Sequence, residues 1–502
     1  MSTVTSRAIS VTSQERTGRP GERRLLAWLF IVLSAAFLIV QEGAVTGYDG
    51  ATMFAVTESL VERGTVAVSP EFNTMPGRGG LEYSRYGLGL SLLAIPPYLA
   101  AKTIPVSSGA ADKLLEGAVS LSMAFVTAAL VVALYVLARR LRSNVGPALL
   151  VAVGGVIGTF VLPYGKEFFS EPLTALCLVV AIERLLAGRA SASGLAMGAA
   201  VVTRTQNVLF APVLVLVAWR RGGLPAAART CAGMVPGAVV TLGYNLIRFG
   251  DPLTFGYEDV GFTTPLLNGV GGLLFNPWKS VLLFAPLVVL LPLALRYLWR
   301  HDRAAFVLLT ANLGITFLVT AAWFAWHGGW SWGPRLLLPG LVPAFAAIAP
   351  WLVTTWRVRT AALLAVAGFA VSFPALIVPT QAQQLETPPV PPEAHFLDTQ
   401  PLASPSVPRQ WELIAPTTRY SLEHRYEGVD DGRNYLRYLS LWQLGVSRVY
   451  GSRGLAAALL VTALLAIIAG WSLLHLVRVA RLFPTHTGGS FTAQEAAVGH
   501  SA

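Results

Sequence analysis

Charged residues are scarce in this sequence. Asp, Glu, Lys and Arg make up 13% of its 502 residues, whereas an average soluble domain has about 25%. A chain this poor in charge cannot cover a water-facing surface, and its hydrophobic content of 54% suits the interior of a bilayer. The composition therefore argues against an ordinary soluble protein and predicts an integral membrane protein.

Cysteine and the common catalytic motifs are also nearly absent. Cys177 and Cys231 both lie in or at the edge of apolar runs, which excludes a disulfide framework and a cysteine metal site. We interpret both as small core residues. The sequence has no phosphate-cradling P-loop, no nucleophile elbow and no zinc-binding helix. It also shows no internal repeat, which weakens a transporter interpretation.

The net charge of +11 comes from arginines gathered in short clusters between apolar runs. This is the pattern of short cytoplasmic loops, so the basic balance indicates membrane orientation and not a nucleic-acid partner. The clusters are Arg139 to Arg142, Arg184 with Arg189, Arg220 with Arg221, Arg300 with Arg303, Arg357 with Arg359, and Arg478 with Arg481. With about twelve membrane helices, all of them face the cytoplasm together with both termini.

The fold class that we predict is an all-α polytopic membrane protein with about twelve transmembrane helices, one short helical hairpin included. The predicted spans are 25–45, 114–138, 146–163, 172–187, the hairpin 194–219, 230–247, 281–298, 305–323, 336–353, 361–378 and 455–477. The predicted domains are a disordered cytoplasmic tail (1–24), a transmembrane module (25–379) with an external loop over 47–113, an external loop or small cap (380–452), a last transmembrane helix (453–479) and a second cytoplasmic tail (480–502).

The first external loop has two apolar segments that do not read as full spans. Residues 51–63 place apolar side chains at helical spacing and end at Gly64, which predicts an amphipathic helix on the membrane surface. Residues 86–104 are apolar but short, and Pro96 and Pro97 interrupt them. We therefore predict an interfacial or re-entrant segment there.

Asp49 is the first acidic residue after the first apolar run, apart from Glu42 near the end of that run. On the predicted outer side it is a candidate catalytic base. The alternative is a helix N-cap, because Asp before Gly50 is a good start for the surface helix. The two roles are compatible, since a helix N-terminus keeps a carboxylate ionised.

Cations follow on the same predicted side, next to apolar segments. They are Lys166, Arg204, Arg335 and Arg85. A lipid-linked phosphate needs fixed positive charge at headgroup depth, and arginine offers it a two-pronged fork. The alternative is that each snorkels or pairs with Glu167, Glu171 or a lipid headgroup. Arg204 fits that alternative least, because it lies at the tip of the short hairpin.

The stretch from Trp326 to Arg335 is dense in aromatic residues and glycine. It reads either as a belt of tryptophans at the membrane interface or as a platform on which sugar rings stack. His327, Trp330 and Trp332 are its candidate ligand contacts.

Several strings, in this order, resemble the C-type (GT-C) membrane glycosyltransferases, a group that includes protein mannosyltransferases and aminoarabinose transferases. They are Tyr48-Asp49-Gly50, Tyr83 to Gly89, Pro163 to Glu167, Thr203 to Gln206, Tyr244-Asn245 with Arg248 to Pro252, and Trp330 to Arg335. The resemblance implies a polyprenyl-phosphate sugar donor, an extracytoplasmic active site and inversion at the sugar carbon. It implies that Asp49 is the general base and that Lys166, Arg204, Arg335 or Arg85 hold the phosphate. The candidate sugar or acceptor contacts are Tyr48, Glu167, Glu171, His327, Trp330 and Trp332.

The prediction is thus an inverting glycosyltransferase of the plasma membrane that transfers a sugar to a glycan, lipid or protein hydroxyl. We expect membrane lipids around it and no nucleic-acid partner. No cofactor is assigned, and a divalent metal is left open. The alternatives are a transporter or flippase of lipid-linked sugars and a non-catalytic assembly protein of the cell envelope. A transporter would need a polar path through the bilayer, and the predicted spans are almost free of charge at mid-helix.

Overall fold

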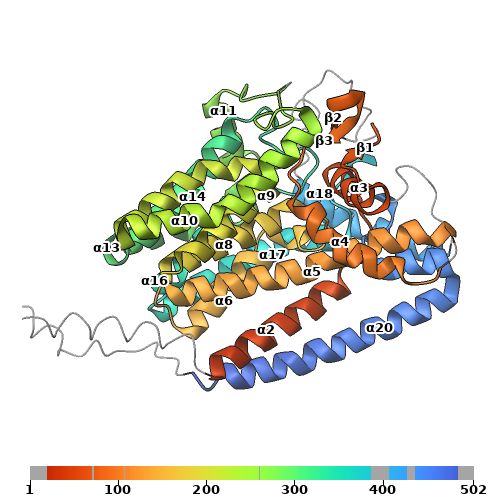
Figure 1. Ribbon diagram of the computed structural model, residues 1–502. Coiled ribbons are helices and arrows are strands. Elements are labelled where there is room, and N and C mark those ends of the chain that lie inside the picture. The colour runs from red at the N-terminus through yellow and green to blue at the C-terminus, as the bar shows by residue number, and fades with distance from the viewer. Residues whose placement is uncertain are drawn as a thin grey trace, which may run out of the picture.

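The computed structural model describes residues 20–70, 73–106, 108–258, 260–385, 406–426 and 436–483. The predictions for most of both tails and for part of the cap lie outside these residues. The described chain is mostly helical (Figure 1). Five of its helices are long and apolar enough to cross a membrane: α5 (Ser108–Arg140), α10 (Ala211–Phe249), α14 (Arg303–Ala322), α17 (Thr355–Ile377) and α20 (Trp442–Ala480). This agrees with the predicted polytopic all-α class, whereas the count of twelve stays a prediction.

Several apolar segments are divided into short helices. They are α6 (Val145–Ile157), α7 (Val161–Tyr164), α8 (Ser170–Leu186), α12 (Val281–Phe284), η3 (Pro286–Leu290), α13 (Leu291–His301), η4 (Arg335–Leu337), α15 (Leu338–Phe345) and α16 (Ile348–Trp351). The spans predicted over 146–163, 281–298 and 336–353 are therefore not single continuous helices. Prolines explain the breaks within 281–298 and 336–353, since a proline lacks the amide hydrogen and clashes with the preceding turn.

The predicted hairpin is confirmed. Helix α9 (Ala190–Thr203) ends at Arg204, which has an extended backbone, and η2 (Thr205–Phe210) starts the return into α10. Helix α10 breaks at Gly222 and Gly223, so the arm that follows Arg204 is short, as predicted.

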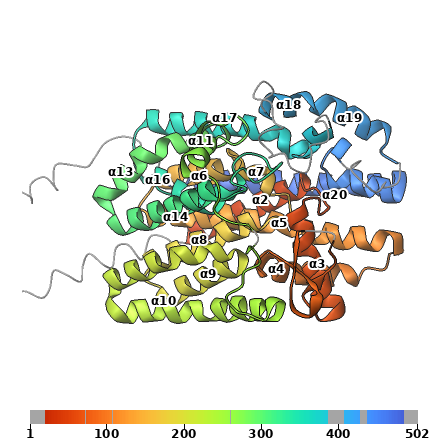
Figure 2. The same cartoon turned by 90° about the horizontal axis from the view of Figure 1, so that it is seen from above.

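Helices α9 and α10 lie side by side (Figures 1 and 2) and touch through glycines. Gly194 and Gly198 on α9 face Gly233 and Gly237 on α10. A Cβ on Gly237 would lie 2.5 Å from the Cα of Gly198. Small residues four apart let two membrane helices approach backbone to backbone, so these glycines set how the helix that carries Arg204 packs.

Replacing Gly237 by Leu should force α9 and α10 apart and lower stability by about 1–3 kcal/mol. Thermal unfolding of the detergent-solubilised protein measures this effect. The matched control is Gly243→Leu on the same helix, because nothing lies within 4 Å of a Cβ at that position. Equal melting temperatures for the two variants would contradict the close packing.

The first loop begins with helix α3 (Tyr48–Arg63), which ends at Gly64 with a φ of 63°, as predicted. Three short strands follow, β1 (Ala67–Val68), β2 (Thr74–Pro76) and β3 (Glu82–Ser84), in the order β1-β3-β2 and antiparallel, with η1 (Arg78–Gly80) between β2 and β3. This small sheet was not predicted. The proline-containing segment forms α4 (Gly89–Lys102), whose 14 residues are too few for an upright span.

Arginine 248, near the end of α10, ties that helix to the small sheet. Arg248 is 2% exposed. Its guanidinium donates to the Ser84 carbonyl and, at 2.6 Å, to the Asn245 side chain, and its carbon lies 3.9 Å from the Tyr244 ring centre. The loop after α10 leads to α11 (Leu266–Phe275).

The two ends of the described chain pack together. Helix α2 (Pro20–Ile39) runs beside α20 in Figure 1, and Trp28 meets Trp471 with ring centres 4.9 Å apart. After α17 come η5 (Ala382–Leu385), α18 (Ser406–Glu412) and α19 (Ile414–Glu423). Helix α20 then starts at Trp442 and bends at Gly451, whose φ is 63°.

Opposite ends of α8 carry different polar groups. Glu171 lies in its first turn, whereas Glu183 in its last turn pairs with Arg140 at 3.0 Å. Glu22 and Arg139 form a second pair, at 2.8 Å, among the same basic clusters. Glu183 follows Glu171 by 12 positions, which correspond to ~18 Å along a helix, so the Glu171 end is well separated from the arginine clusters.

Candidate functional site

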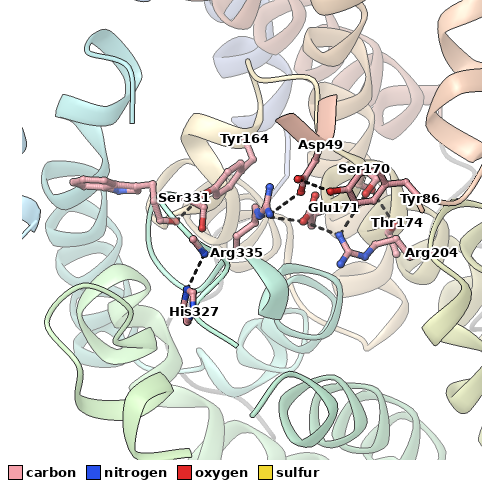
Figure 3. A network of polar contacts seen from close by, with 12 residues as sticks. Asp49, Tyr86, Tyr164, Ser170, Glu171, Thr174, Arg204, His327, Ser331 and Arg335 are labelled. Atoms are coloured by element: carbon pink, nitrogen blue, oxygen red, sulfur yellow. Dashed lines mark hydrogen bonds and ion pairs between the residues drawn. The ribbon is translucent and has the colours of Figure 1, made fainter. Parts of the chain in front are cut away.

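Asp49 lies at the centre of a polar network in which residues far apart in sequence meet (Figure 3). Its Oδ1 accepts a 2.6 Å hydrogen bond from the Tyr86 hydroxyl, and its Oδ2 accepts one of 2.8 Å from Arg335 Nη2. The N-cap of α3 is Gly47, and Asp49 follows in the first turn. The simple N-cap interpretation of Asp49 was therefore wrong, because its side chain points to Tyr86 and Arg335.

A second carboxylate continues the network. Glu171 Oε1 lies 2.7 Å from Arg204 Nη1 and 3.3 Å from Arg335 Nε. Arg204 also reaches the Ser170 hydroxyl at 3.4 Å. Two carboxylates and two guanidiniums thus alternate in the order Asp49, Arg335, Glu171, Arg204, and their formal charges cancel.

Burial differs along this row of charges. The Glu171 side chain is 1% exposed and that of Arg335 is 9% exposed, whereas Asp49 and Arg204 are 21% and 18% exposed. Water or a ligand therefore reaches the two outer members, while the inner pair is fixed. The ring of Phe169 lies under Arg335, 4.5 Å from the guanidinium carbon, and holds it further.

The surroundings keep Asp49 ionised. Burial raises the pKa of its carboxyl, but the charge of Arg335, the hydrogen bond from Tyr86 and the charge of Arg204 outweigh burial and bring the pKa below its ordinary value. The same environment raises the pKa of Tyr86 well above its ordinary value, through burial first and then the Asp49 charge. At neutral pH the carboxylate accepts the bond and the phenol keeps its proton.

Lysine 279, which the sequence analysis did not single out, holds the loop that carries Arg335. Its side chain is buried, and its Nζ donates to the Gly329 carbonyl at 2.7 Å and to the Ser331 carbonyl at 2.5 Å. Gly328 and Gly329 in this loop have φ angles of 65° and 66°, which favour glycine. The Lys279 bonds and the two glycines therefore fix the loop that places Arg335 next to Asp49.

No family model matches the sequence, and no curated protein matches it. The fold is similar to crystal structures of ArnT from Cupriavidus metallidurans. The form bound to undecaprenyl phosphate has 15% identity and a TM-score of 0.48, over 91% of this chain and 77% of that one. The apo form has 15% identity and a TM-score of 0.49, over 91% and 76%.

A second likeness is to the Archaeoglobus fulgidus oligosaccharyltransferase in its apo form, with 14% identity and a TM-score of 0.47. It covers 84% of this chain, which spans 59% of the length of that protein. Both proteins are C-type glycosyltransferases, the group that the sequence strings resemble.

The aromatic part of the loop mostly packs inward. Trp332 is 2% exposed, meets Phe284 edge to face with ring centres 5.2 Å apart, and accepts the Tyr164 hydroxyl on its carbonyl at 2.8 Å. His327 accepts the backbone amide of Gly329 on its Nδ1 at 2.9 Å. Both residues shape the loop, and Trp330 lies beside Trp332 against Thr380 and Gln383.

Lys166 and Glu167 make their hydrogen bonds in a neighbouring buried cluster. The Lys166 Nζ donates to the Ser440 carbonyl at 3.1 Å, and the Ser440 hydroxyl donates to Glu42 at 2.8 Å. Glu167 accepts from the Thr380 hydroxyl at 3.4 Å, and burial together with the Glu42 charge raises its pKa to about 8. This cluster joins the end of α2 to the start of α20.

The remaining candidates lie around the network. Arg85 donates to the Thr74 carbonyl at 3.2 Å, and its charge acts on Tyr257, as do those of Asp49 and Arg204. Tyr48 is 70% exposed, next to Asp49 at the start of α3. Tyr257, in the loop after α10, was not singled out from the sequence; its pKa rises to about 12, mainly through burial.

The described residues contain no group of three or more His, Cys, Asp and Glu side chains arranged to hold a metal ion. Asp49 and Glu171 each face a guanidinium, which a divalent cation would have to displace. This donor set does not fit a metal site.

Proposed function

We propose that this protein is an inverting glycosyltransferase that moves a sugar from a polyprenyl phosphate to an acceptor hydroxyl. The observation that carries the proposal is the Asp49–Arg335 pair next to Arg204. It combines an ionised, partly exposed carboxylate with two fixed guanidiniums at the edge of an apolar bundle. A base and a phosphate site are the two parts that this reaction needs.

Donor binding changes the partners of the network. The phosphate oxygens accept hydrogen bonds from the guanidiniums of Arg335 and Arg204, because guanidinium pairs strongly with phosphate. Arg335 then shares its charge between the phosphate and Asp49. Glu171 is buried, contacts both arginines and keeps their two guanidiniums in place. The carboxylate of Asp49 becomes available to a hydroxyl.

The transfer is a single displacement. The acceptor oxygen attacks the anomeric carbon from the side opposite the phosphate, and its proton passes to Asp49. The bond between that carbon and the phosphate oxygen breaks, its electron pair stays on the phosphate, and Arg335 and Arg204 stabilise the charge that develops there. Attack from the opposite side inverts the configuration at the anomeric carbon.

The position of the network favours the extracytoplasmic face. Glu171 opens α8, and the basic clusters gather at the other end of that helix with Glu183 and Arg140. Because such clusters stay in the cytoplasm, the Asp49 end is proposed to face outward. A nucleotide sugar is not available there, which favours a lipid-linked donor.

Transfer is tested with purified protein in phospholipid vesicles. Radiolabelled polyprenyl-phosphate sugars and a lipid and glycan extract of bacterial membranes are supplied together. We expect label to move from the donor to an extract component, and no label to move when the same sugars are supplied as nucleotide esters. Movement of intact donor across the vesicle membrane without transfer would instead favour a flippase.

Replacing Tyr86 by Phe removes one hydrogen bond that lowers the pKa of Asp49. Asp49 acts only as the carboxylate, so activity is lost as the pH falls through its pKa. Because the variant raises that pKa, the acid limb of kcat/KM should move to higher pH. At neutral pH we expect a loss of about threefold to tenfold, and an unshifted acid limb would contradict the role of Tyr86.

A further inference from the structure

A cavity lies beside residues 42–46, the segment just before Asp49, and outside the ion network. Its volume is about 770 Å³, within the ~300–1,000 Å³ of sites that enclose small molecules. Its walls come from the end of α4, the start of α5 and the start of α20. The lining is mainly apolar, with Val45, Pro97, Ala101, Leu121, Val446 and Val449 among its residues.

The groups proposed above to hold the donor phosphate lie outside this cavity. Tyr86, Glu171, Arg204 and Arg335 do not line it. Its own charges are balanced, because Lys113 lies 3.6 Å from Glu116, and Arg448 and Glu42 contribute one charge of each sign. Such a surface suits an apolar body with an uncharged head better than a phosphate.

The cavity also reaches toward the reacting groups. Glu42, Thr46 and Ser440 line it, and Thr46 is three residues before Asp49, at most ~11 Å away along the chain. Among the described residues, the buried Oε2 of Glu42 has no hydrogen-bond partner. A buried carboxylate oxygen without a partner calls for a donor, which a ligand hydroxyl can supply.

We propose that this cavity binds the acceptor, and that the acceptor is a membrane glycolipid with an uncharged, hydroxyl-bearing head. Its acyl chains occupy the apolar walls, and a sugar hydroxyl reaches Asp49 from residues 42–46. The proposal rests on the function proposed above. The donor phosphate and the acceptor lipid thus approach Asp49 from different elements, which is compatible with attack from the side opposite the phosphate.

Gly445 allows the cavity to be filled without distorting the fold. It lines the cavity, and nothing lies within 4 Å of a Cβ at that position. Gly445→Trp therefore places a large ring in open space, and Gly445→Leu fills less of it. Gly470→Trp is the matched control, because Gly470 lies in the same helix with equally open surroundings but outside the cavity lining.

The experiment is photo-crosslinking in phosphatidylglycerol vesicles with two diazirine probes, a glucosyl diacylglycerol and decaprenyl phosphate. We expect the glycolipid probe to label the wild type and Gly470→Trp on residues 97–121 and 439–450. Gly445→Trp should reduce this labelling at least about tenfold, Gly445→Leu should reduce it less, and decaprenyl phosphate labelling should stay unchanged.

Two results overturn the proposal. If Gly445→Trp loses decaprenyl phosphate labelling instead, the cavity holds the donor chain. If all variants are labelled alike by the glycolipid, the cavity binds no acceptor lipid. Labelling measures binding and not turnover, so the two proposals can fail separately. If the wild type shows the expected labelling but transfers no sugar, the glycosyltransferase function is contradicted and the lipid-binding site is still supported.

Discussion

Replacing Asp49 by Asn should abolish sugar transfer and at the same time tighten the binding of polyprenyl phosphate. The amide cannot take the acceptor proton, which predicts a loss of about 10²–10⁴-fold in kcat. It also no longer competes for Arg335, which Asp49 holds at 2.8 Å. The Kd for polyprenyl phosphate should fall about threefold to tenfold, or ~1 kcal/mol.

These opposite changes separate a base from a merely structural carboxylate. Transfer is measured with labelled donor in vesicles, and binding is measured by titration of polyprenyl phosphate against tryptophan fluorescence. Glu62→Gln is the matched control, because Glu62 lies in the same helix and pairs with Lys102, at 2.6 Å, away from the network. Undiminished transfer by Asp49→Asn would remove Asp49 from the reaction.

Local features of the site could be predicted from the sequence. The spacing in residues 51–63 and the stop at Gly64 predicted the helix that begins beside Asp49, and the short halves around Arg204 predicted the hairpin. Both depend on interactions between neighbours in the chain, which periodicity and helix ends record.

Long-range partners could not be predicted in the same way. Asp49 and Arg335 are 286 residues apart, and nothing in either local sequence selects the other. The same holds for Lys279, whose contacts lie in the loop before Arg335. For Trp332 the sequence left open a membrane-interface belt or a sugar platform, whereas in the structure it is 2% exposed and its ring packs against Phe284.

Replacing Arg335 by Gln should have the largest effect on stability. Arg335 bridges Asp49 and Glu171, which are 21% and 1% exposed. Removing one partner of a buried ion pair typically costs about 3–5 kcal/mol, because the other charge stays buried without compensation. We expect a clear fall in melting temperature and polyprenyl phosphate binding that is weaker by about 10–100-fold.

The double variant Asp49→Asn with Arg335→Gln separates stability from function. It removes one negative and one positive charge together, so Glu171 and Arg204 remain as a balanced pair at 2.7 Å. The melting temperature should return part of the way to that of the wild type, a non-additive result expected of residues in contact. Sugar transfer should stay absent and polyprenyl phosphate binding should stay weak, because the variant lacks both the base and one of the two guanidiniums. If Arg335→Gln alone bound polyprenyl phosphate as the wild type does, Arg335 would hold Asp49 in place and nothing more.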